Sequence, residues 1–199
     1  DEAAVDDQLV ALAVVRAGRW SDGVWLQGVR YGTVGVRKGD FRLEITTFRS
    51  DTYREDSRKP EVTFGRSIDE DLARRDFSVN AMAVALSAPG ELIDPEGGEE
   101  DLRRGLLRVL HERSLADDPT RALRAARYAA RLCLEPEPGT LEQIRVADLN
   151  AVSADRIEAE RRKLAVEPEP GRGFELLDRW GLIPLAPVAE KEPRSNLSL

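Results

Sequence analysis

The spacing of apolar residues changes near residue 115, and this change most limits how the chain can fold. Before it, short stretches alternate apolar and polar residues between glycines and prolines, a pattern typical of β-strands and turns. Beyond it, the spacing is helical, and the predicted helices span 118–134, 138–149, 153–166 and 171–180. We therefore predict an α+β fold, with an α/β unit over 1–115, an all-helical unit over 116–186, and a tail or truncation over 187–199.

The first 68 residues predict a helix, a hairpin and a loop. Residues 3–18 place apolar side chains three or four apart, which favours an amphipathic helix closed by Gly18. Residues 32–37 and 41–49 alternate like strands around Lys38-Gly39-Asp40, so we expect a β-hairpin. Residues 50–68 are polar and show no sustained periodicity, which favours a loop.

A helix running into a strand is predicted over 68–86, with Ser67 as its N-cap and Glu70 three residues further on. The segment ELIDPEGGEEDLRRGLLRVL, residues 91–110, then reads as strand, turn and strand. These elements would complete the α/β unit.

The composition excludes several classes of protein. No apolar run approaches the roughly 18 residues that a membrane helix needs, and the first ten residues are acidic where a secretion signal is basic, so we expect a cytoplasmic protein. The single cysteine, Cys133, lies in the apolar stretch RLCL and is expected to be buried. His111 has no neighbouring ligands at metal-binding spacing, and the three tryptophans are scattered, which favours packing roles.

A stripe of arginines lies within this acidic chain. The formal net charge of -7 argues against a nucleic-acid partner, yet DPTRALRAARYAAR carries arginine at 121, 124, 127 and 131. Asp118 and Pro119 suit a helix start, and arginines every three residues stay on one slowly drifting face. Small alanines between them allow close approach by another surface. Guanidinium groups suit phosphate oxygens and base acceptors, so a nucleotide site and a solvated charged face both remain open.

A second candidate is the segment RRDFSVNA, residues 74–81. Its adjacent arginines can hold a triphosphate, while Asp76 and Asn80, four apart, would share one side of a helix and can hydrogen-bond a ribose hydroxyl. An ion-paired surface turn remains an equal alternative for this segment by itself.

The two segments and their order resemble a known family. RRDFSVNAMA, then ELIDPEGGEEDLRRGLLRVL, then LADDPTRALRAARYAARL, is similar to the signature of class II RNA nucleotidyltransferases, the bacterial CCA-adding enzymes and poly(A) polymerases. The resemblance continues upstream through GVRYGTVGVRKGDFRLEITTFRSDTYREDSRKPEVTFG and downstream through VSADRIEAERRKL and GFELLDRWGLIPL. It thus covers nearly the whole chain.

This resemblance implies an α/β nucleotidyltransferase head followed by a helical neck. The family transfers a nucleoside monophosphate from CTP or ATP to the 3′-hydroxyl of tRNA or another RNA, using two Mg²⁺ ions held by a paired Asp-x-Asp. Carried over by match, Arg75 would contact the triphosphate, and Asp76 with Asn80 would recognise the ribose. Asp118 and Arg121 would read the base edge as a protein template. Arg124 and Arg127 would support the same pocket.

The chain departs from the family pattern at the metal site. No Gly-Gly turn or Asp-x-Asp pair occurs before the hairpin, and the chain opens with Asp1-Glu2-Ala3, so we treat these residues as a fragment that is inactive alone. Glu44 matches an acidic position near the metals, but a lone carboxylate cannot hold two ions, and an ordinary exposed strand residue is the alternative. Asp117 stands where the family often has Glu.

Three functional readings remain from the sequence. The first is an enzyme that adds CCA, CC, A or poly(A) to RNA, which these motifs do not distinguish. The second is a non-catalytic relative that keeps the nucleotide pocket as a binding or regulatory module. The third is a helical scaffold whose arginines are incidental.

Overall fold

The computed structural model describes residues 14, 16, 18–26, 29, 32–54, 57–64 and 67–182. The chain forms two compact units. One contains the chain up to Arg103 together with Val109–His111, and the other contains Arg104–Arg108 and the chain from Glu112 onward. The first unit is mixed and the second mainly helical, so the α+β prediction is confirmed. The assignment of functional domains to 1–115 and 116–186 stays a prediction.

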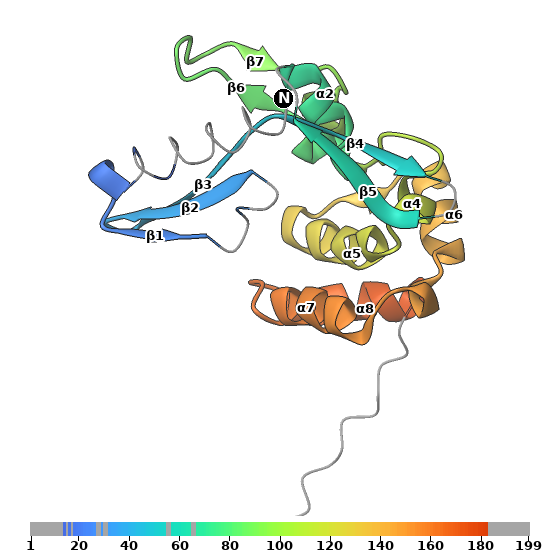
Figure 1. Ribbon diagram of the computed structural model, residues 1–199. Helices are drawn as coiled ribbons and strands as arrows, with labels where there is room; N and C mark the ends of the chain where they lie inside the picture. The colour runs from blue at the N-terminus through green and yellow to red at the C-terminus, as the bar shows by residue number, and fades with distance from the viewer. Residues whose placement is uncertain are drawn as a thin grey trace, which may run out of the picture. The chain divides into compact units, whose positions relative to one another are not determined.

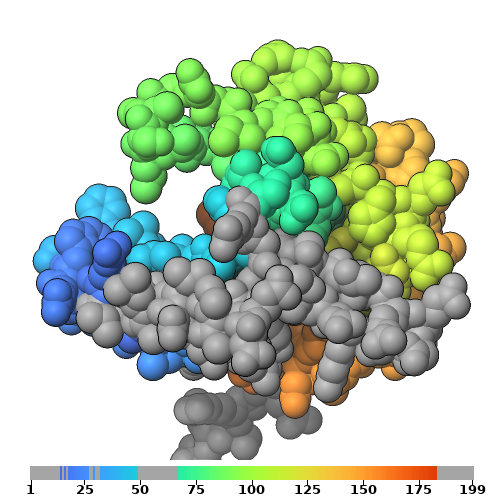
Figure 2. Space-filling view, turned by 45° about the horizontal axis from the view of Figure 1, so that its top comes forward, coloured from blue at the N-terminus to red at the C-terminus, as the bar shows by residue number. Residues whose placement is uncertain are grey.

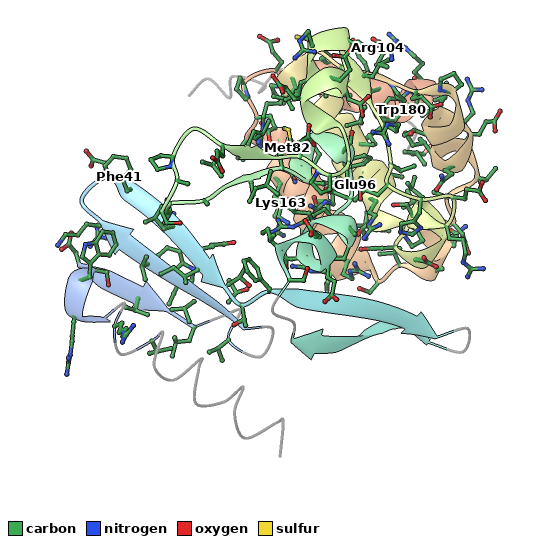
Figure 3. The ribbon with its side chains drawn as sticks, turned by 90° about the horizontal axis from the view of Figure 1, so that it is seen from above. Phe41, Met82, Glu96, Arg104, Lys163 and Trp180 are labelled. Atoms are coloured by element: carbon green, nitrogen blue, oxygen red, sulfur yellow. The ribbon has the colours of Figure 1, made fainter. Side chains whose placement is uncertain are left out.

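A three-stranded antiparallel sheet lies in the first unit (Figure 1). Its strands are β1 (Gly23–Trp25), β2 (Thr33–Lys38) and β3 (Phe41–Thr46). The hairpin prediction is confirmed, because β2 pairs with β3 from Thr33↔Thr46 to Lys38↔Phe41 around a turn in which Gly39 has φ +55°. Figure 3 labels Phe41 at the turn end of the sheet.

The small core of this sheet consists of the buried side chains of Val34 and Val36, with Val14 and Val29 packed against them. Gly35 lies between them because the ring of Trp25 covers it: a Cβ there would lie 1.9 Å from that ring. Of the helix predicted over 3–18, residues 14, 16 and 18 are helical, and the rest lies outside the described residues.

A second hairpin replaces the loop predicted over 50–68. Strands β4 (Arg49–Arg54) and β5 (Ser57–Phe64) pair antiparallel, so that prediction was wrong. The ladder rests on backbone hydrogen bonds, which require no alternation of apolar residues. Its register shifts between Thr52 and Arg54, and Pro60 falls in the irregular stretch opposite, where its missing N–H breaks no regular pair.

The helix running into a strand that was predicted over 68–86 is present, and its helical part is short. Helix α2 (Ile68–Ala73) begins as predicted, with Ser67 Oγ accepting from the Glu70 backbone N–H at 3.4 Å. The chain then turns through a 3₁₀ segment, η2 (Ser78–Asn80), into a strand, β6 (Ala83–Val84). In Figure 2 the light-green hairpin of β6 and β7 (Leu92–Ile93) projects from the surface.

The strand-turn-strand predicted over 91–110 was also wrong. A helix, α3 (Gly98–Arg104), separates β7 from β8 (Leu106–Leu107). Asp94 explains it, since its carboxylate oxygens accept from the backbone N–H groups of Gly98 at 2.7 Å and Glu99 at 2.9 Å. Acidic residues in the first turn add favourable interaction with the helix dipole.

The second unit is built on helices, as predicted. Its short strands β8 and β9 (Glu135–Pro136) pair in parallel. The predicted helices over 118–180 are present within a few residues of their expected bounds, preceded by a short α4. They are α4 (Ser114–Asp117), α5 (Thr120–Leu132), α6 (Pro138–Val146), α7 (Ala154–Ala165) and α8 (Pro170–Arg179), with a 3₁₀ turn η3 (Leu149–Ala151).

Helix α5 is the centre of this unit, with α7 and α8 on one side of it (Figure 1). The alanines of α5 are buried, which confirms that they allow a close approach. Gly173 allows α8 and α7 to meet, because a Cβ there would lie 2.3 Å from Leu164. The side chains that complete this core include Leu164, Leu176, Leu177 and Trp180, the last labelled in Figure 3.

Two single-residue predictions need correction. Cys133 is exposed, because it caps α5 in the left-handed conformation with φ 55°, and Arg172 Nη1 lies 3.2 Å from its Sγ. Trp20 is exposed, whereas Trp180 packs in the core as expected. Within the described ranges, no helix has the length and apolar character needed to cross a bilayer.

Candidate functional site

A buried carboxylate holds the two adjacent arginines of the RRD segment. Asp71, on α2, accepts from Arg74 Nη2 at 2.5 Å and from Arg75 Nη2 at 2.8 Å. The side chain of Arg75 is 39% exposed and that of Arg74 is 14% exposed. Arg75 is therefore the one of the pair with more surface available to an anion.

Charge explains why a carboxylate is stable at this position. Burial by itself would raise the pKa of Asp71, but the hydrogen bonds and positive charges of Arg74 and Arg75 outweigh it and hold that pKa below its ordinary value. Asp71 is thus ionised at neutral pH. It holds the guanidinium of Arg75, whose side chain stays partly accessible.

Asp76 and Asn80 are brought together, though by a different route from the predicted one. The α2 helix ends at Ala73, so the two residues do not share a helix face. Instead the η2 turn places Asn80 Nδ2 3.0 Å from Asp76 Oδ1, which also accepts from the Phe77 backbone N–H at 3.0 Å. Asp76 is buried and Asn80 is half-buried, so Asn80 is the more accessible of the two.

The η2 turn is anchored to α3 by a buried hydrogen bond. Ser78 Oγ lies 2.6 Å from Asp101 Oδ2, and both side chains are buried. The two elements approach so closely that a Cβ at Gly98 would lie 2.2 Å from the Ser78 carbonyl oxygen. This anchoring fixes the position of Asn80.

In the second unit, Asp118 precedes α5 and is held by several donors. Its Oδ1 accepts from the Thr120 backbone N–H at 3.1 Å and from Thr120 Oγ1 at 2.7 Å. Arg156, on α7, places Nη2 3.0 Å from Oδ1 and 3.1 Å from Oδ2. The side chain of Asp118 remains 23% exposed, so an acceptor oxygen is within reach of a ligand.

Arg121 lies on the first turn of α5 and is buried, with 7% of its surface exposed. Its Nη1 donates to Ser114 Oγ at 2.6 Å, which ties it to α4. The neighbouring Asp117, whose role in the template the sequence left open, pairs with Arg113 Nε at 3.5 Å. Asp118 and Arg121 thus supply an acceptor and a donor from the same end of α5.

The arginine stripe is divided between two environments. Arg127 lies 3.7 Å from Glu160 and 3.5 Å from Glu167, and its guanidinium carbon lies 4.6 Å from the centre of the Tyr128 ring. Arg131 Nε donates to Glu167 at 2.7 Å. The stripe is therefore not a purely basic face, because α7 and the turn after it supply acids at its C-terminal end.

The ion pairs also shift the pKa of the acids that make them. The hydrogen bond from Arg131, with the charges of Arg131 and Arg127, holds the pKa of Glu167 below its ordinary value despite burial. The hydrogen bond that Arg131 donates to Glu167 in turn raises the pKa of Arg131. Arg124 lies between the two environments, 5.9 Å from the Tyr128 ring centre.

The described residues do not form a metal site. Glu44 is exposed on β3, and no group of three or more His, Cys, Asp or Glu side chains in the described part of the chain could hold an ion. The donor set therefore does not fit the two-metal arrangement that the family resemblance implies.

Several contacts of the candidate residues were not foreseen from the sequence. Asp71 lies three and four residues before its arginine partners, a spacing that predicts ion pairs on a helix. Arg156 and Glu167 come from α7 and the turn after it, 38 residues from Asp118 and 36 from Arg131. No local signal predicts pairs at such separations.

Known proteins are similar in sequence to most of this chain. Residues 15–108 match the family described as the poly A polymerase head domain. A CC-adding tRNA nucleotidyltransferase of Deinococcus radiodurans is 43% identical over 152 residues, which are 74% of this chain and 40% of that protein. A CCA-adding enzyme of Geobacillus stearothermophilus is 39% identical over 177 residues, 86% of this chain and 43% of the relative.

The fold agrees with solved structures of similar proteins. A tRNA-processing enzyme with CTP superposes with a TM-score of 0.70 at 31% identity, over 87% of this chain and 45% of that one. The chain thus spans less than half the length of the relatives that it matches. Its fold is that of a nucleotidyltransferase head with a helical neck, and the chain belongs to the family of CCA-adding enzymes and poly(A) polymerases.

Proposed function

We propose that the protein containing this chain adds nucleotides to the 3′ end of tRNA, transferring CMP, or CMP and AMP, from CTP and ATP. The observation that carries the proposal is the pairing of an accessible acceptor, Asp118, with a buried donor, Arg121, at one end of α5. The similarity to CC-adding and CCA-adding proteins supports it.

The α5 residues would select the base. Cytosine and adenine both carry an exocyclic amino group, where uracil and guanine carry a carbonyl oxygen. A carboxylate accepts from the amino group and repels the carbonyl, so Asp118 suits CTP and ATP and rejects UTP and GTP. Arg121 would donate to a ring acceptor of the base, and the half-buried Arg124 would support this binding.

Arg127 has a different role in this proposal. Its pairs with Glu160 and Glu167 neutralise its charge against α7 and the turn after it. We therefore assign Arg127 to holding α5 in place, and its contribution to nucleotide binding is indirect.

The residues of the first unit would bind the sugar and the phosphates. Arg75 offers a partly exposed guanidinium held by Asp71, an arrangement suited to a triphosphate. Asp76 and Asn80 would recognise a ribose hydroxyl, since a carboxylate accepts from a hydroxyl and an amide can accept from it or donate to it. Magnesium dependence is part of the proposal for the whole protein, and no described residue is assigned to the ion.

The proposal is tested by assaying the protein at its natural full length on tRNA that ends before the first C, after C, and after CC. Labelled CTP, ATP and UTP are supplied separately. Incorporation of CMP alone would identify CC addition, and CMP followed by AMP would identify CCA addition. Failure to extend any of the three tRNAs, or extension with UMP at a comparable rate, would contradict the proposal.

A further inference from the structure

The carboxylate of Asp118 is clamped by a residue with no assigned role, Arg156 on α7. One nitrogen, Nη2, lies 3.0 Å from Oδ1, 3.1 Å from Oδ2 and 3.2 Å from Thr120 Oγ1. It therefore bridges both oxygens of the carboxylate and the hydroxyl that already donates to Oδ1. These contacts join α7 to the start of α5.

The two oxygens of Asp118 have unequal surroundings. Among the described residues, Oδ1 accepts from the Thr120 backbone N–H, from Thr120 Oγ1 and from Arg156, while Oδ2 accepts from Arg156 alone. A carboxylate oxygen has about two lone-pair positions. Oδ2 thus retains acceptor capacity, and the contacts on Oδ1 hold the carboxylate plane in one orientation.

We propose that Arg156 is a positioning residue for base selection, which holds Asp118 so that Oδ2 accepts from the exocyclic amino group of cytosine or adenine. This inference rests on the proposed function of Asp118. Discrimination by hydrogen bonds depends on donor and acceptor direction, so a carboxylate free to rotate would select less sharply. Arg156 acts through Asp118 and does not touch the base.

The exposure of the Arg156 side chain distinguishes a positioning role from a purely structural one. The side chain of Arg156 is 56% exposed, and exposed ion pairs contribute little to stability. A second exposed arginine on α7, Arg162, pairs with Glu158 at 3.0 Å and supplies a matched control. Both variants remove one arginine and one carboxylate contact from the same helix.

The test measures binding of CTP and UTP by titration calorimetry to the 199-residue chain and to its Arg156→Ala, Arg156→Lys, Arg162→Ala and Asp118→Ala variants. We expect the chain to prefer CTP over UTP by about fivefold or more. Arg156→Ala should lose most of this preference, and Arg156→Lys should keep part of it because it retains a donor. Arg162→Ala should keep all of it, and the midpoint of thermal unfolding of Arg156→Ala should fall by less than about 4 °C.

The outcomes separate the two proposals. If Asp118→Ala abolishes the preference but Arg156→Ala retains it, the role of Arg156 is overturned and that of Asp118 stands. The role of Arg156 is also overturned if Arg156→Ala binds CTP more tightly. The same holds if Arg156→Ala weakens the binding of CTP and of UTP equally and lowers the midpoint of thermal unfolding. A chain that binds both nucleotides equally overturns both proposals.

Discussion

Arg127 of α5 lies 3.5 Å from Glu167, in the turn that follows α7, and Arg131 donates to the same carboxylate at 2.7 Å. Two arginines of the stripe are therefore committed to helix packing. Those nearer the start of α5, Arg121 and Arg124, make no ion pair with Glu160 or Glu167 among the described contacts.

Removing Glu167 should destabilise the helical unit. Glu167→Ala leaves Arg127 and Arg131 without this acid, and the side chain of Glu167 is 6% exposed, so we expect the free energy of unfolding to fall by about 2 kcal/mol. Urea denaturation followed by circular dichroism measures it. Glu158→Ala, which removes an exposed acid from α7, should change it by less than about 0.5 kcal/mol. Equal losses of unfolding free energy in the two variants would show that Glu167 stabilises the fold no more than an exposed acid does.

Replacing Asp71 with Asn should loosen Arg75. The neutral amide keeps the shape but loses the charge that holds both guanidinium groups, which predicts a loss of about 2 kcal/mol in unfolding free energy and weaker binding of CTP. Calorimetric titration of CTP and urea denaturation measure the two effects. Asp69→Asn, an exposed acid in the same helix, is the control. Unchanged CTP affinity in Asp71→Asn would contradict a role for this pair in binding the triphosphate.

Acid should destabilise the protein through the same two carboxylates. The pKa values of Asp71 and Glu167 in the folded state lie below their ordinary values of 3.8 and 4.5, so each stabilises the fold above those values. This contribution is lost as pH falls through the lowered folded pKa. Hence the difference in unfolding free energy between the wild type and Asp71→Asn should shrink below about pH 4. A difference that stays constant from pH 7 to pH 3 would refute this linkage.

Arg121 should not be replaceable by lysine. Its guanidinium donates to Ser114 Oγ at 2.6 Å while buried, and a lysine offers a single ammonium that cannot reproduce the planar fork. We expect Arg121→Lys to weaken CTP and ATP binding by about tenfold, measured by calorimetry. Arg145→Lys, near the exposed end of α6, is the control. Full affinity in Arg121→Lys would remove the proposed base contact.

The sequence predicted those parts of the fold whose signals are local. The hairpin of β2 and β3 follows from alternation around Gly39, and α5 to α8 follow from apolar spacing with proline and glycine between them. The β4–β5 hairpin was missed because its strands lack alternation, and α3 was missed because the acceptor that starts it, Asp94, precedes two glycines that resemble a turn. Hydrogen bonds of the backbone form both the β4–β5 hairpin and the start of α3, and the apolar pattern does not reveal them.

The residues of the candidate site are a prediction from the sequence, whereas their contacts come from the fold. A helix start and a regular spacing single out Asp118 and Arg121, but only the family resemblance implies that they read the base. The pairing of Asp71 with Arg75 is readable from their separation. The partners Arg156 and Glu167 depend on how α7 and the turn after it pack against α5, which no local pattern determines. For the same reason the sequence predicted one continuous arginine face, whereas the packing of α7 and the turn after it pairs Arg127 and Arg131 with acids.

Calorimetric titration of CTP and UTP against the wild type, Asp118→Ala and Glu158→Ala shows whether Asp118 selects the base. Each variant removes a carboxylate that pairs with an arginine of α7. If Asp118 selects the base, the wild type and Glu158→Ala should prefer CTP by about fivefold or more, and Asp118→Ala should bind both nucleotides alike. An undiminished preference for CTP in Asp118→Ala would contradict base selection by Asp118.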